Sequence, residues 1–105
     1  MALYSAVINS NLLFKIAEII LPEKYTIKPT YERPINHIEQ ESNLKKILAF
    51  FTHNRVLKPD YTLKARSIIK RDKIVLNHLL TDLMKFYVNK HSSEKAKSLA
   101  KYVKI

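Results

Sequence analysis

Apolar residues first recur at helical spacing between residues 9 and 21 of the chain. They form one stripe along a predicted helix and comprise Leu12, Leu13, Ile16, Ile19 and Ile20. Asparagine or serine at positions 9–11 can cap the amino end of this helix. Pro22 ends it, because the residue before a proline is disfavoured in the helical conformation. The pattern therefore predicts a first helix over residues 9–21.

Residues 22–40 show no helical repeat and contain three of the four prolines of the chain. We predict an extended arm here. A structureless stretch of this length is unusual inside a compact domain. We therefore expect the arm and the first helix to dock on a neighbouring protein, through residues 22–40 and the stripe Leu12, Leu13, Ile16, Ile19 and Ile20.

Helical patterning resumes at Ser42, which can cap a second helix. The apolar positions of this helix recur at i, i+3, i+4 and i+7, and they are Leu44, Ile47, Leu48 and Phe51. Asn54 is expected to end it in a left-handed conformation, since the chain has no glycine for that role. Another helix is predicted from Pro59 to about Ile69, because proline is favoured at the first helical position.

A basic turn at Lys70 and Arg71 precedes the last predicted helix. Asp72 caps this helix, which runs to about Met84. Its inward face is apolar and consists of Val75, Leu76, Leu79, Leu80 and Leu83. Its outward face is polar and consists of Lys73, Asn77 and Thr81.

Beyond Met84 the pattern changes period. Residues 85–90 favour a strand, since they include aromatic and β-branched side chains. Residues 91–97 are polar and basic, and residues 98–105 fit either a closing strand or a last helix. Three helices, a strand, a basic loop and a return segment are the order of a winged helix-turn-helix. The predicted fold is mainly α with a small β wing: an N-terminal helix and docking arm over residues 1–40, then a basic winged-helix-like domain over 41–105.

The formal net charge of +10 is unevenly distributed over the 105 residues. The first 50 residues carry six basic and five acidic residues, whereas the rest carry thirteen and four. Charge concentrated in this way repels itself unless a polyanion neutralises it. The pattern indicates contact with RNA, DNA or an anionic membrane surface, against the simpler alternative of a basic face that only meets solvent.

The composition argues against several kinds of chemistry. Without cysteine there is no disulfide framework or thiolate metal site, and without glycine there is no glycine-rich phosphate loop. The four histidines are too scattered for a recognisable metal motif, and no nucleophile stands beside an obvious base. We therefore expect a non-enzyme with no catalytic residue, metal or cofactor. The apolar run Leu12–Leu21 is too short to span a bilayer, so no membrane span is expected.

Four segments carry a resemblance to a known family: Asn43-Leu-Lys-Lys-Ile-Leu48, Asn54-Arg-Val-Leu-Lys-Pro59, Val75-Leu-Asn-His-Leu-Leu80, and Val88-Asn-Lys-His-Ser92 with Lys95-Ala96. They resemble the first helix, the segment before the second helix, the recognition helix, and the strand and wing of eukaryotic small-subunit ribosomal protein twenty-five. The resemblance covers residues 41–97 with one single-residue gap near Ile69. It implies a cytoplasmic structural protein in the head of the small ribosomal subunit, which contacts ribosomal RNA and serves translation.

The leading hypothesis is accordingly a small basic protein that binds ribosomal RNA. Fifteen lysines against four arginines favour point-charge contacts with phosphates over bidentate reading of bases. The turn, the third helix of the domain and the wing are expected to supply the contacts, from Arg55, Lys64, Arg66, Lys70, Arg71, Lys73, Asn77, Lys85, Lys90, His91, Lys95 and Lys97.

Three alternatives fit the same features. A ribosome-bound dormancy factor shares the charge and the expected RNA contacts. A winged-helix DNA-binding regulator would read base edges through an outward group, for which Asn77 is the best candidate. A basic accessory subunit of a mitochondrial membrane complex would use the apolar stripe of the first helix to dock on a hydrophobic partner.

Overall fold

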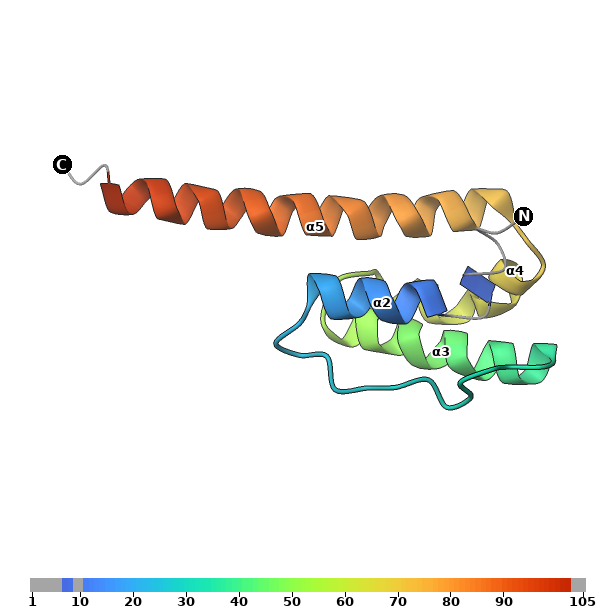
Figure 1. Cartoon of the computed structure of the whole chain (residues 1–105). Helices are drawn as coiled ribbons and strands as arrows, with labels where there is room; N and C mark the ends of the chain where they lie inside the picture. Colours follow the sequence, from blue (N-terminus) through green and yellow to red (C-terminus); the bar gives the residue numbers. More distant parts are fainter. Residues whose placement is uncertain (1–6, 9–10, 103–105) are drawn as a thin grey trace.

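This computed structural model describes residues 7–8 and 11–102 of the chain, and helices are the only regular secondary structure in that part, which contains no strand. Its elements are α2 (Asn11–Ile20), α3 (His37–His53), the 3-10 helix η1 (Pro59–Leu63), α4 (Ala65–Ile69) and α5 (Lys73–Tyr102). Helices α2 and α3 lie side by side beneath the first part of α5, which continues well beyond them (Figure 1). The radius of gyration, 15.7 Å, exceeds the roughly 13 Å of a compact chain this long, because α5 projects.

The first predicted helix is confirmed as α2, and most of its apolar stripe packs inside the molecule. Leu13 and Ile20 are buried, and Leu12 and Ile16 pack partly buried against the same core. Ile19 differs, with 63% of its surface exposed. Much of the stripe that we expected to meet a neighbouring protein therefore faces the chain's own α3 and α5.

Helix α3 begins earlier than predicted, at His37 rather than Ser42. Its cap is Asn36, whose side-chain oxygen accepts a hydrogen bond of 2.9 Å from the Glu39 amide. The Glu39 carboxylate in turn accepts one of 3.3 Å from the Ile35 amide. These two bonds fix the start of a helix among residues too polar to show an apolar repeat, and the irregular arm is correspondingly shorter than predicted.

The arm is held on α3 by one buried asparagine. Asn43 has no exposed surface, accepts a 3.0 Å hydrogen bond from the Tyr31 amide and donates one of 2.7 Å to the Tyr31 carbonyl. Nearer α2, the Tyr25 ring meets the Phe50 ring edge-on at 6.3 Å between centroids. The arm is thus a packed part of this domain, with both hydrogen-bonding groups of the Tyr31 backbone satisfied by Asn43.

Arginine takes the left-handed positions that glycine usually fills. Helix α3 ends in a pair of bonds, from the Arg55 amide to Thr52 and from the Val56 amide to Phe51. Arg55 has φ 60° there, and Arg71 has φ 63° after α4, whereas Asn54 has φ −90°. The prediction that Asn54 is left-handed is therefore wrong by one residue.

Replacing Arg55 by glycine is expected to raise the free energy of unfolding by about 1 kcal/mol, because glycine has no Cβ to clash at positive φ. Urea unfolding followed by circular dichroism measures the change. Lys58→Gly is the control, since Lys58 has an ordinary φ of −67° and the substitution there only adds freedom to the unfolded chain. Equal effects of the two substitutions would show that the left-handed turn carries no strain.

Helix α5 corrects the largest error of the sequence-based prediction. Asp72 caps it as expected, accepting from the amides of Ile74 and Val75. The strand over residues 85–90 and the wing over 91–97 are wrong, since residues 73–102 form one helix. Phe86 and Tyr87 continue the inward face begun by Leu76, Leu79 and Leu83, so helical burial outweighs their strand propensity. Residues 98–102 are helical rather than a strand, and residues 103–105 lie outside the described part.

One cluster of side chains joins all the helices. It contains Leu13 and Phe14 of α2, Leu48 and Phe51 of α3, Ile68 of α4, and Leu76, Leu79 and Leu83 of α5. Residues before and after position 40 therefore contribute to the same core. No described helix is long and apolar enough to cross a membrane.

Candidate nucleic-acid interface

The sharpest concentration of free positive charge is the turn between α4 and α5. Lys70, Arg71 and Lys73 are all exposed, and none forms an ion pair with a described residue. The turn has a fixed shape, because the Arg71 amide bonds to the Ile68 carbonyl and the Asp72 amide to the Ser67 carbonyl. We call Lys70, Arg71 and Lys73 the basic turn.

The amino end of α5 adds less to this turn than expected. Amides at a helix amino end attract anions when they are free. Here the Asp72 side chain accepts from two of them, at 3.0 and 3.3 Å. An anion at the basic turn would therefore be held by the lysine and arginine side chains themselves.

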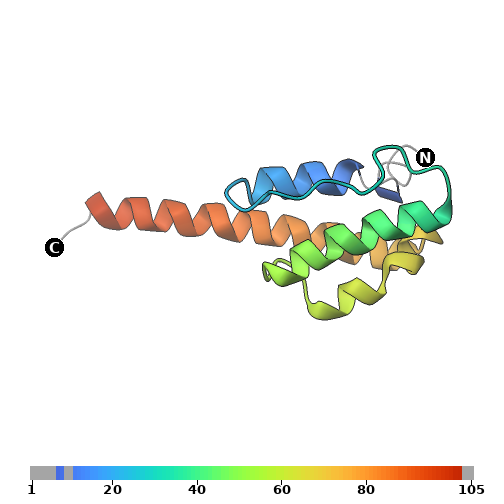
Figure 2. The same cartoon turned by 90° about the horizontal axis from the view of Figure 1, so that it is seen from below.

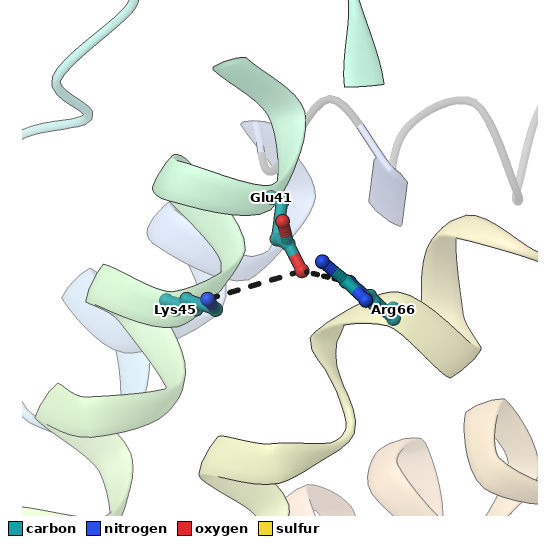
Figure 3. A network of polar contacts seen from close by, with 3 residues as sticks. All are labelled: Glu41, Lys45 and Arg66. Carbon is teal, nitrogen blue, oxygen red and sulfur yellow. Dashed lines mark hydrogen bonds and ion pairs between the residues drawn. The ribbon is translucent and has the colours of Figure 1, made fainter. Parts of the chain in front are cut away.

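Arg66 lies on α4 and pairs with an acid of α3. Its Nε is 3.0 Å from the Glu41 carboxylate, and the same oxygen lies 3.9 Å from the Lys45 ammonium (Figure 3). Two cations thus share one carboxylate, which leaves a net positive charge on this surface. The Arg66 side chain remains 79% exposed, so it can meet an anion without leaving Glu41 buried and unpaired.

Lys64 is engaged by neighbours within the molecule. Its ammonium lies 3.4 Å from the Asp60 carboxylate and 5.1 Å from the centre of the Tyr61 ring. The Tyr61 hydroxyl donates a 2.6 Å hydrogen bond to Asp82 of α5. Burial, and then this bond to a carboxylate, raise the pKa of Tyr61 well above its ordinary value.

Lys90 is also engaged, and it joins α5 to the end of α2. Its ammonium donates 2.8 Å to the Ile20 carbonyl and 3.1 Å to the Glu23 carboxylate. The pKa of Glu23 is lowered, chiefly by a hydrogen bond to its own backbone and next by the hydrogen bond from Lys90. Lys90 therefore stabilises the carboxyl end of α2, a role that no local sequence signal indicates because its partners are 70 and 67 residues away.

Nine of the twelve predicted RNA-binding residues have side chains that the structure describes, and these nine are spread over more than one part of the molecule. Helix α4 and the turn that follows it lie at the end of the molecule where α3 begins, and α3 ends on the other side (Figure 2). Arg66 of α4 accordingly meets Glu41 in the first part of α3, whereas Arg55 follows the end of α3 by two residues. Asn77 and Lys85 are exposed along α5. His91, Lys95 and Lys97 belong to the projecting part of α5, and their side chains lie outside the described part.

Nothing in the described part suggests a metal centre, since no group of three potential ligand side chains comes together there. The winged-helix DNA regulator loses its main support, because the wing that defines it is replaced by α5. Comparison with known proteins finds no match to the chain among family models, curated proteins or solved structures. Its function must therefore be inferred from the residues themselves.

Proposed function

We propose that this chain is a small RNA-binding structural protein of a ribonucleoprotein particle, and that the small ribosomal subunit is the particle in which it works. The observation that carries the proposal is the basic turn, three exposed cations on a rigid turn with no acidic partner among the described residues. Phosphate groups are the natural counterions for such a cluster.

The projecting part of α5 supports the same function. It leaves the body of the molecule and, by sequence, carries Lys95, Lys97 and Lys101 against the single acid Glu94. A basic helix of this kind can lie along an RNA backbone at a distance from the core. Contacts of this type position a protein on RNA without reading its sequence, which fits the excess of lysine over arginine.

The salt dependence of RNA binding tests the proposal. We expect the triple variant Lys70→Gln, Arg71→Gln, Lys73→Gln to bind a structured RNA hairpin more weakly, with the slope of log K against log salt reduced by about 2 between roughly 50 and 200 mM. Each lost phosphate contact removes part of the counterion release. Fluorescence anisotropy of the labelled hairpin measures both quantities.

The control variant Lys24→Gln, Lys28→Gln, Lys46→Gln removes the same number of charges from exposed lysines of the arm and α3. If the control loses as much affinity and slope as the test variant, binding reflects net charge alone and the basic turn is not the interface. The assembly is tested separately by sedimentation of the native chain. We expect the chain to co-sediment with small ribosomal subunits and to lose this association after ribonuclease treatment. Sedimentation that does not change after ribonuclease treatment would contradict the proposed assembly.

A further inference from the structure

An apolar hollow of about 390 Å³ lies between α2 and α5, away from the basic turn. Ile16, Ile19 and Ile20 line it from α2, and Leu80, Leu83 and Met84 line it from α5 together with Tyr87. Two of these side chains are largely open to solvent, Ile19 at 63% and Met84 at 64%. Exposed aliphatic groups gathered around a hollow mark an interaction surface more often than isolated ones do.

A second hollow lies on the other side of the same two α5 residues. It measures about 420 Å³ and is lined by Leu80, Thr81, Met84, Lys85, Val88 and Asn89. Leu80 and Met84, four residues apart, therefore form a ridge with a hollow on each side. A second helix can pack on such a surface, because the rows of its side chains fit into the grooves on either side of the ridge. We call the ridge and its two hollows the α2–α5 groove.

The exposed charges on the α5 side of this groove are all positive. Residues 73–90 include four charged side chains, and Asp82 is turned inward to Tyr61 while Lys90 is turned to the end of α2. The exposed charges that remain on this part of α5 are Lys85, which lines the second hollow, and Lys73, which belongs to the basic turn at the start of the helix. On α2, the exposed Lys15 and Glu18 balance each other. An occupant with acidic flanks is therefore favoured, and a second copy of this +10 chain is disfavoured by repulsion.

We propose that the α2–α5 groove binds an amphipathic helix of a partner protein. The apolar row of that helix fills the two hollows beside Leu80 and Met84, and aspartate or glutamate on its flanks faces Lys85. This is helix-in-groove recognition, with affinity from the buried aliphatic row and orientation from the charges. The inference is separate from the proposed RNA binding, because Lys70, Arg71 and Lys73 do not line either hollow, so either can fail without the other.

The test uses the full chain and a labelled designed peptide that has leucines at i, i+3, i+4 and i+7 and glutamates on both flanks. A second peptide has lysine in place of each glutamate. We expect the glutamate peptide to bind, and the lysine peptide to bind at least about tenfold more weakly. Met84→Glu should weaken binding of the glutamate peptide by at least about tenfold, because it places a carboxylate on the ridge.

Ile35→Glu is the matched control, since Ile35 is 83% exposed on the arm and the charge change is identical. It should leave binding within about twofold of the wild type, and both variants should keep the wild-type thermal unfolding curve. Equal loss in the two variants, equal binding of the two peptides, or no binding of the glutamate peptide would overturn the proposal. A wild-type dimer that is dissociated by Met84→Glu would also overturn the proposal, because the groove would then bind a second copy of the chain. Binding of the wild type to phosphatidylglycerol vesicles, abolished by Met84→Glu and without binding of the peptide, would overturn it as well.

Discussion

Asn43→Asp is expected to lower the free energy of unfolding by about 3 kcal/mol near neutral pH, although the two side chains have the same shape. One oxygen of the introduced carboxylate would still accept from the Tyr31 amide. The other would face the Tyr31 carbonyl, to which Asn43 now donates at 2.7 Å. A buried carboxylate would then oppose a carbonyl oxygen with no water to separate them.

The same variant should recover stability in acid. Burial disfavours the charged form, so the pKa of the new carboxyl is higher in the folded than in the unfolded chain, where it is about 4. The folded protein therefore keeps its proton to higher pH. The stability of the variant is fully present below about pH 4 and is lost as pH rises through the folded-state pKa.

Urea unfolding at pH 4 and pH 7, each compared with the wild type, measures both effects. Asn77→Asp is the control, since Asn77 is exposed on α5 and the substitution there should cost under about 0.5 kcal/mol at either pH. A pH-independent difference, or one no larger than in the control, would mean that the Asn43–Tyr31 contact contributes nothing to folding.

Leu79→Ala is expected to lower the free energy of unfolding by about 3 kcal/mol, within the usual range of 2–5 kcal/mol for a buried leucine. Leu79 has no exposed surface and lies at the centre of the inward face of α5, between Leu76 and Leu83. Truncation removes apolar contacts and leaves a cavity between α5 and the rest of the core. The midpoint of urea unfolding should fall while the slope of the transition stays unchanged.

Met84→Ala, further along the same helix, provides the comparison. Its side chain is 64% exposed, so the cost should be under about 0.5 kcal/mol. A similar loss of stability in both variants would contradict the assignment of the inward and outward faces of α5. This comparison also shows whether the α2–α5 groove can be altered without unfolding the protein.

Local signals in the sequence were sufficient for much of the helical structure. The apolar repeat of α3 and the inward face of α5 up to Leu83 are recognisable because each follows one helical period. Asp72 is recognisable as a cap because its partners are the backbone amides two and three residues later in the chain. The basic turn follows from composition alone, as charged residues between two helices are exposed by default.

The errors arose where the deciding partner is distant. Residues 85–90 have strand propensity, but Phe86 and Tyr87 pack against a core that includes α2, more than sixty residues earlier. Asn43 appears as one polar residue among the apolar positions of a helix, and only the Tyr31 backbone explains its burial. The α2 side of the α2–α5 groove was predicted as part of a docking stripe, but its α5 side was missed because recognising it requires α5 to continue beyond Met84.

The Lys90 contact has a consequence for synthesis of the chain. Its partners Ile20 and Glu23 lie 70 and 67 residues earlier, whereas α3, η1 and α4 pack on near neighbours. Closing so long a loop costs entropy that local contacts avoid. Because a chain is made from its amino end, α2 is complete long before Lys90 leaves the ribosome. The carboxyl end of α2 is thus secured by Lys90 only after α3, α4 and more than half of α5 have been synthesised.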